Sequence, residues 1–251
     1  MGWRSARLGA VCVLAIGILA ASTPVGAQAS GRGYLFKDPR VRLTVRGGVD
    51  GATAGGDLFS FVTEQLTLEK RDFRGGTFGI DAAVRLTPRI DAVLAGSFAK
   101  AIEQSEFRDF VDTDDNAIEQ TTTLSRSPFT LGLRAYLTPR GRSVGSLAWI
   151  PTRFSPYVGA GGGAMLYQFR QAGDFVDYET LDIFYEDLVS SGWTPTAHAA
   201  LGFDYSLSAP VALNVEAKYT YARASLGEDF VGFDRIDLSG VSTTLGLSLR
   251  F

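Results

Sequence analysis

The chain has 251 residues, with 24 basic against 27 acidic side chains and a net charge of −3. This near balance excludes the basic footprint of a nucleic-acid-binding protein and a polybasic membrane-binding patch. With 29 glycines and 12% aromatic residues, the composition favours many turns and pleated strands.

The first 29 residues predict a secretory signal peptide. A positively charged start precedes an uncharged apolar run at residues 8–21, and small residues then offer cleavage after Ala27 or Ala29. The alternative is an uncleaved membrane anchor, but the run is shorter than the roughly 20 residues that a spanning helix needs. We therefore expect one mature domain, residues 30–251.

The single cysteine, Cys12, lies inside the apolar run and not at its end, where a lipoprotein would carry it. The mature domain would then contain no cysteine, which excludes disulfides, thiolate chemistry and cysteine metal sites. With only one histidine, His198, we expect neither a metal site nor a cofactor.

Alternation of apolar and polar side chains predicts eight β-strands in the mature domain. The pattern is clearest at residues 241–251, where one face is mostly apolar and the other small or polar. The glycine-rich segment 157–169 leaves its register open. The other six segments cover about 41–46, 77–86, 90–98, 129–137, 197–206 and 211–221.

The connections differ in length in a regular way. Short proline-containing turns at residues 86–89 and 207–210 each join two strands. A third connection at the same end of the strands begins at Leu137, but residues 141–152 make it longer than a turn requires. The remaining connections are long and acidic, at about 50–76, 104–125, 170–193 and 224–237. Short turns at one end and long loops at the other predict an all-β, eight-stranded, antiparallel, up-and-down transmembrane barrel.

A soluble lipocalin-like barrel is the alternative, because it also has eight antiparallel strands. Three features favour the membrane. The charged faces carry many small residues, as a narrow lumen requires; aromatic residues gather near strand ends on the apolar face; and the chain stops there at Phe251. We expect a monomer in the bacterial outer membrane, reached through the periplasm and surrounded by lipid and lipopolysaccharide.

The faces expected to line the lumen carry charges of both signs in nearly equal number. They are Arg42, Arg46, Asp50, Asp81, Arg85, Asp91, Arg134, Asp204, Glu216, Lys218 and Arg250. One interpretation is a polar pore. We favour a salt-bridge network that plugs the barrel, because eight strands leave room for little beyond side chains and an open ion pore usually carries an excess of one sign.

Two further features suggest chemistry only weakly. A small lipid A deacylase would show a His-x-Ser arrangement, but Ala200 stands two positions after His198, so we expect no enzymatic activity. The glycine run 159–164 lacks the Lys-Ser/Thr of a phosphate-binding loop and lies in a strand pattern, where glycine permits curvature or close approach.

The third long loop, 171–192, alternates acidic with large apolar residues, and its 180–189 stretch predicts either a short amphipathic helix or an extended hairpin. Its large side chains are candidates for the mouth of a hydrophobic ligand path, for contact with a surface partner, or for packing against the rim. They include Phe175, Tyr178, Leu181, Phe184 and Tyr185.

From Phe154 onward the chain resembles the OmpW family, within the wider group of OmpA/OmpX-like eight-stranded barrels. The resemblance rests on segments 156–161 (PYVGAG), Trp193 with 202–205, and 213–215. It implies binding or passage of small hydrophobic molecules. Leu249 and Phe251 resemble the C-terminal signal read by the barrel-assembly machinery. The alternatives are a structural or adhesive surface protein like OmpX and a lipid A-modifying enzyme.

Overall fold

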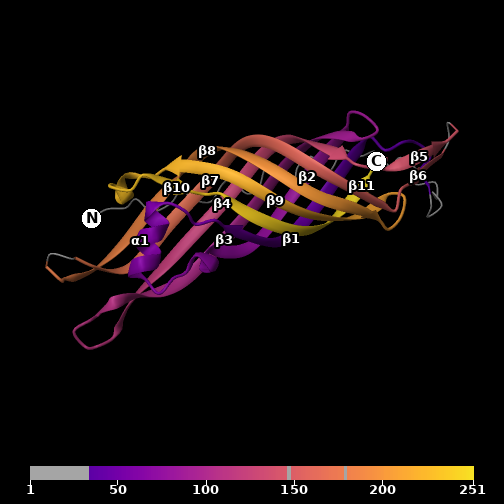
Figure 1. Ribbon diagram of the computed structural model, residues 1–251. Coiled ribbons are helices and arrows are strands. Elements are labelled where there is room, and N and C mark those ends of the chain that lie inside the picture. The colour runs from indigo at the N-terminus through magenta and orange to yellow at the C-terminus, as the bar shows by residue number, and fades with distance from the viewer. Residues whose placement is uncertain (1–33, 146–147, 178–179) are drawn as a thin grey trace, which may run out of the picture. The chain divides into compact units, whose positions relative to one another are not determined.

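The computed structural model describes residues 34–145, 148–177 and 180–251, which belong to one compact unit. The predicted signal peptide and Cys12 lie outside the described residues. Eight antiparallel strands form a ring in the order β1-β2-β3-β4-β7-β8-β9-β11 (Figure 1). Their bounds are β1 Val41–Ala52, β2 Arg74–Arg85, β3 Ile90–Val111, β4 Ala117–Tyr136, β7 Phe154–Val176, β8 Ile183–Ser206, β9 Val211–Ser225 and β11 Gly240–Arg250.

The ring is closed by hydrogen bonding between its first and last strands. β1 pairs with β11 from Arg42 opposite Arg250 to Ala52 opposite Gly240, so the predicted closing strand does close the barrel. The backbone of Phe251 continues this contact, because a carboxylate oxygen of this last residue accepts hydrogen bonds from the amides of Arg40 and Val41 at 2.7 and 3.2 Å. The predicted eight-stranded barrel is confirmed.

Smaller elements lie at the two ends of the ring. β5 (Gly141–Val144) and β6 (Ala148–Pro151) form a separate hairpin within the long connection from β4 to β7. The connection from β1 to β2 contains helix α1 (Asp57–Gln65) and the 3-10 turn η1 (Lys70–Phe73). The connection from β9 to β11 contains η2 (Glu228–Phe230) and β10 (Arg235–Asp237), which pairs with β9. No helix in the described ranges is long and apolar enough to cross a membrane.

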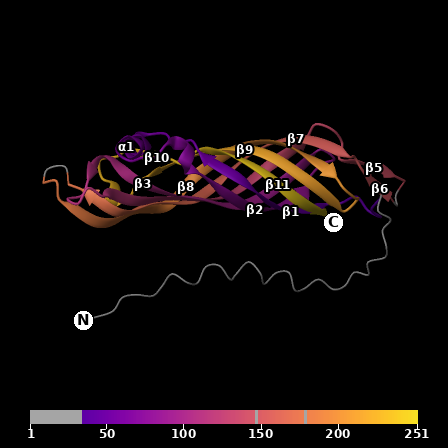
Figure 2. The same cartoon turned by 90° about the horizontal axis from the view of Figure 1, so that it is seen from below.

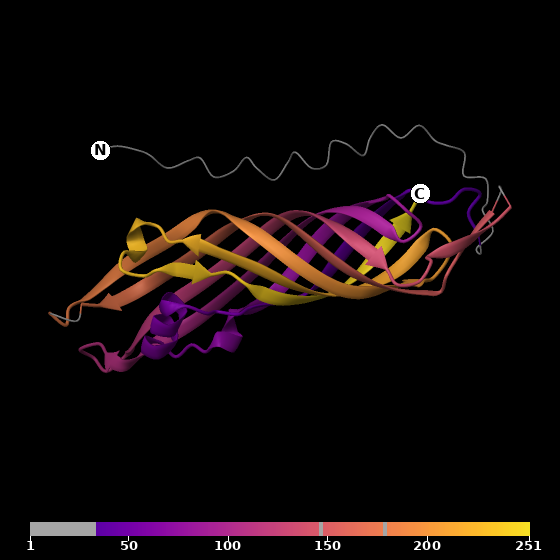
Figure 3. The same cartoon turned by 45° about the horizontal axis from the view of Figure 1, so that its top comes forward.

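We call the two ends of the barrel the turn end and the loop end. The turn end carries the 86–89 and 207–210 connections, the β5–β6 hairpin and the C-terminus, and the loop end carries α1, β10 and the tips of the longest hairpins (Figures 2 and 3). The turn end therefore matches the predicted short-connection end, except that one of its connections is a hairpin.

Two of the segments predicted as loops are mostly β-strand. Most of residues 104–125 belongs to β3 and β4, and most of 170–193 to β7 and β8, so these strands are 20 to 24 residues long. The apolar alternation stops before the strands do. On β4, for example, the outward side chains Thr121 and Thr123 are polar although the backbone stays paired to β3 and β7. A strand surrounded by water needs no apolar outer face.

The outer surface of the ring is apolar over its middle part. Leu94, Leu131 and Leu201 each expose 62–64% of their surface. Neighbouring strands add further exposed residues: Val45, Ile80, Phe98, Phe129, Val158, Leu166, Trp193, Tyr219, Leu245 and Leu247. Such a belt around a whole barrel far exceeds the apolar patches that soluble monomers expose.

Candidate functional site

Two buried carboxylates organise the barrel interior toward the turn end. Asp204 on β8 is fully buried and accepts hydrogen bonds from Arg42 on β1, from Tyr136 Oη on β4 at 2.8 Å and from Asn214 Nδ2 on β9 at 2.8 Å. The same carboxylate therefore joins four strands across the lumen. Arg42 also lies 4.0 Å from Asp91 on β3, which accepts a hydrogen bond from Arg140 Nη1 at 2.8 Å.

The second carboxylate, Glu216 on β9, lies one layer closer to the loop end. It accepts hydrogen bonds from Arg46, from Arg134 Nη2 at 3.1 Å and from Tyr157 Oη at 2.9 Å. Asp81 on β2 completes this layer through ion pairs with Arg46 and, at 3.5 Å, with Arg134. The guanidinium of Arg134 also lies 4.3 Å from the centre of the Tyr157 ring.

The remaining charges predicted for the lumen lie at its ends or stand apart. Arg85 pairs with Asp38 at the turn end. Asp50 pairs with Arg126 nearer the loop end. Within the described part of the chain, neither Lys218 nor Arg250 has a carboxylate within ion-pair distance.

Sequence reasoning missed several members of the network. Tyr136 lies on the inward face of β4 with Arg134, but the alternation assigns it no role. Arg126 lies between the expected loop 104–125 and the expected strand 129–137, outside both. Tyr157 was hidden by the open register of the glycine-rich strand, which the structure sets with Tyr157, Met165 and Tyr167 facing inward. A search for inward tyrosines next to arginines would have found only Tyr136.

An apolar cluster fills the interior at the loop end. Phe59 of α1 packs between Phe73 of η1 and Phe169 of β7, with ring centroids 4.8 and 5.7 Å apart, and Phe230 of η2 lies 5.5 Å from Phe169. The cluster also contains Leu58, Val62, Leu66, Leu68, Leu124, Met165, Tyr167, Ile236 and Leu238, all nearly or fully buried. The connections expected to be solvated loops thus build a second core on the projecting strands.

Helix α1 is held in this cluster by its own sequence and by flanking contacts. Leu58, Phe59 and Val62 fall on its buried face, and Gly56, with φ of 92°, provides the turn into the helix. After the helix, the amide of Thr67 donates to the carbonyl oxygen of Glu106 on β3 at 2.9 Å. This contact covers an edge of β3 that β2 is too short to pair.

The third predicted loop is an extended hairpin. β7 and β8 stay paired up to Val176 opposite Ile183, and the rings of Phe175 and Phe184 stack at 6.2 Å. Leu181 and Tyr185 expose 64% and 69% of their surface at the tip. Tyr178 lies outside the described residues. Phe175 and Phe184 continue the face of the hairpin that carries Phe169 and Leu188, whereas Tyr185 lies on the opposite, outer face.

His198 lies half-buried on the inward face of β8, opposite Gly161 and Thr220. A β-carbon at Gly161 would lie 2.8 Å from His198 Cε1, so glycine at this position permits close packing of β7 against the imidazole. His198 Nδ1 is buried and has no hydrogen-bond partner among the described residues, so no serine or acid is bonded to this nitrogen. The same residues contain no cluster of three or more groups suited to a metal ion.

The closed ring, the apolar belt and the polar interior together define the class of protein. Each strand of the ring is hydrogen-bonded to a neighbouring strand on both sides, and this closure is what a sheet in lipid requires. The protein is an eight-stranded transmembrane β-barrel of the bacterial outer-membrane type, with its turn end toward the periplasm and its loop end outside the cell.

Comparisons with known proteins add no family. No family model matches the chain, and no curated protein matches it. Among solved structures, it is similar to the outer membrane protein OprG from Pseudomonas aeruginosa, with 14% identity, a TM-score of 0.45 and coverage of 86% of this chain and 99% of the other. It is also similar to Neisserial surface protein A, with 11% identity, a TM-score of 0.44 and coverage of 87% of this chain and 99% of the other. For E. coli outer membrane protein W, the identity is 16%, the TM-score is 0.39, and the match covers 86% of this chain and 100% of the other.

Proposed function

We propose that this barrel acts through its extracellular surface, as a structural or adhesive protein, and does not pass solutes through its interior. The observation that carries the proposal is the filling of the interior at two levels. Ion pairs around Asp204 and Glu216 occupy one level, and the cluster around Phe59 and Phe169 occupies the other. Two cavities between strands in the interior have volumes of only about 20 and 30 Å³, enough for one or two waters.

The working surface in this proposal is the tip of the β7–β8 hairpin. It presents Leu181, Phe184 and Tyr185 to water on strands that project beyond the apolar belt. Large apolar side chains held in this way on a paired strand are typical of a protein-binding surface. The partner would carry a complementary apolar patch at the cell surface.

Planar-bilayer recording tests this proposal. We expect the purified barrel to give no stable conductance steps, and we expect deletion of residues 181–188 to leave that baseline unchanged. The same deletion should remove any adhesion that the full-length protein confers on cells. Stable conductance that disappears with the deletion would contradict the proposal and support a channel.

A second candidate function is the binding of small hydrophobic molecules at the extracellular mouth. The apolar cluster favours it, because an apolar ligand could replace α1 against Phe169 and Leu124 if the helix moved away. The OmpW resemblance points in the same direction. Saturable binding of a fluorescent fatty acid that increases in a variant lacking residues 57–65 would favour this candidate over the first.

We further propose that the protein is not an enzyme and that it inserts as a monomer. Leu249 and Phe251 face outward at the end of β11, with 49% and 63% of their surface exposed, which suits recognition by the assembly machinery. The His198→Ala variant should leave the lipid A of expressing cells unchanged in mass spectrometry. A change in lipid A that depends on His198 would contradict this.

A further inference from the structure

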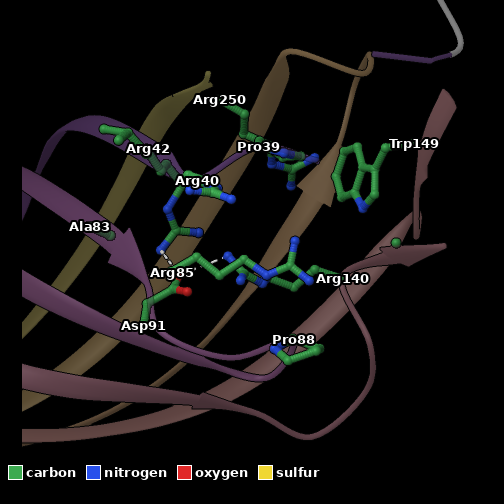
Figure 4. A pocket seen from close by; sticks show the side chains of 12 residues that line it. Pro39, Arg40, Arg42, Ala83, Arg85, Pro88, Asp91, Arg140, Trp149 and Arg250 are labelled. Carbon is green, nitrogen blue, oxygen red and sulfur yellow. Dashed lines mark hydrogen bonds and ion pairs between the residues drawn. The ribbon is translucent and has the colours of Figure 1, made fainter. Parts of the chain in front are cut away.

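A pocket lined by arginines lies at the periplasmic end of the barrel, under the β5–β6 hairpin (Figure 4). Its volume is about 20 Å³. Trp149 of β6 is buried on one side of it and Asp91 of β3 on the other. The hairpin is fixed there because Leu35 and Trp149 exchange backbone hydrogen bonds of 2.9 and 2.8 Å.

The pocket has an excess of positive charge. Five of its lining residues are arginines: Arg40, Arg42, Arg85, Arg140 and Arg250. Three carboxylates, those of Asp38, Asp91 and Asp204, are within ion-pair distance of this set. The terminal carboxylate of Phe251, which accepts a hydrogen bond from the Arg40 amide, adds a fourth negative charge. Positive charge therefore remains in excess by one, whereas the layer around Glu216 pairs two arginines with two carboxylates.

Several guanidinium groups in this pocket have donors without acceptors. Arg140 uses Nη1 for Asp91, but its Nε and Nη2 are buried and have no hydrogen-bond partner among the described residues. The same is true of Arg250 Nη2, although Nη1 of this side chain donates to Ser206 Oγ at 2.9 Å. Arg250 as a whole is only 6% exposed. Buried charged donors without acceptors are strongly unfavourable. Arg46 and Arg134 of the Glu216 layer also have such donors, so the pocket is distinguished by the combination of these donors with an excess of positive charge.

We propose that this pocket binds a small oxyanion of the periplasm, of the phosphate class. Planar guanidinium groups form short, charge-assisted hydrogen bonds with such oxygens, often in pairs. Arg140 and Arg250 supply the free donors, Arg42 and Arg85 supply positive charge, and Trp149 limits the size of the ligand. A cavity of this size fits a small soluble anion and is too small for the acyl chains of a phospholipid.

The anion links the hairpin to the barrel wall. Arg140 precedes β5, whereas Arg250 lies on β11 and Arg85 on β2, so an oxyanion between them holds the connection from β4 to β7 over the periplasmic mouth. This accounts for the extra length of residues 141–152, which a simple turn would not need. The inference is independent of the extracellular function proposed above.

Isothermal titration with inorganic phosphate tests the site. The barrel, in vesicles of phosphatidylcholine at constant ionic strength, is expected to bind one phosphate with saturation. Arg140→Gln and Arg250→Gln should each weaken binding about tenfold, since each removes a charged donor. Arg89→Gln is the matched control, because Arg89 lies on the exposed 86–89 turn at the same end but does not line the pocket. It should bind phosphate like the unchanged protein.

Gel mobility before and after boiling will show that each variant is folded, which matters for Arg250 because it lies on the closing strand. The absence of saturable binding in the unchanged protein would overturn the proposal, as would equal weakening by Arg89→Gln, which would indicate diffuse attraction. Vesicles with added phosphatidylglycerol should leave the phosphate affinity unchanged. Competition by that lipid would overturn the assignment to a soluble anion in favour of a headgroup.

Discussion

Replacing Glu216 with alanine is expected to lower the free energy of unfolding by about 3–5 kcal/mol, as for other buried pairs that lose one partner. Glu216 accepts hydrogen bonds from Arg46, Arg134 and Tyr157 in the barrel interior. Without it, only Asp81 remains to compensate two buried guanidinium groups. Urea titration of the barrel in lipid vesicles, followed by the mobility shift of the folded form, measures the change.

Lys218→Ala is the matched control for this experiment. Lys218 lies two residues further along β9, also faces the interior, and has no carboxylate within ion-pair distance among the described residues. Its removal should change stability by less than about 1 kcal/mol, or increase it, because an uncompensated interior charge is lost. Equal destabilisation by the two substitutions would show that the Glu216 contacts contribute nothing specific.

Phe59→Ala is expected to release helix α1 from the extracellular core without unfolding the barrel. Phe59 is fully buried between Phe73 and Phe169, and removing such a ring costs about 3–5 kcal/mol. The β1–β2 connection is anchored mainly through this cluster, so it should open locally. Trypsin added to intact cells should then cut after the exposed Lys70 or Arg71 at least about 100-fold faster.

Phe61→Ala is the control on the same helix. Phe61 is 42% exposed, and its ring centroid lies 5.4 Å from that of Phe233, outside the buried cluster. We expect its replacement to change the cleavage rate by less than about threefold. If the two variants are cut equally fast, or if Phe59→Ala also abolishes the heat-dependent mobility shift, the extracellular core is not a separate cooperative unit.

The membrane-spanning part of the fold could be predicted well from the sequence. Within lipid, each residue of a strand must present either an apolar side chain outward or a small or polar one inward, so the pattern of 241–251 already identifies both faces. Beyond the lipid the pattern no longer identifies strands. β7 continues to Val176 with Gln168, Arg170 and Asp174 on its outer face, so this part of the strand resembles a solvated loop in sequence.

The charged residues that line the interior could be predicted from the sequence, but the ion pairs between them could not. The charges expected to line the lumen face inward, yet nothing in the alternation says that Arg46 and Glu216, 170 positions apart, meet across it. That meeting depends on which strands lie opposite each other and on the stagger between them. The glycine-rich strand shows the same limit, because both of its faces are small and only its neighbours fix Tyr157 inward to reach Glu216.

The sequence by itself therefore determined a closed, lipid-embedded barrel ending on an outward aromatic residue. The lipid requires an apolar side chain at every second position, and this requirement acts on each strand separately. Only the tertiary structure decided how the barrel is filled. It paired the lumen charges, folded α1 onto Phe169 as an extracellular core, and brought Arg140 and Arg250 together under a periplasmic hairpin. These contacts join residues that are distant in the chain, through the geometry of closure, which no local pattern contains.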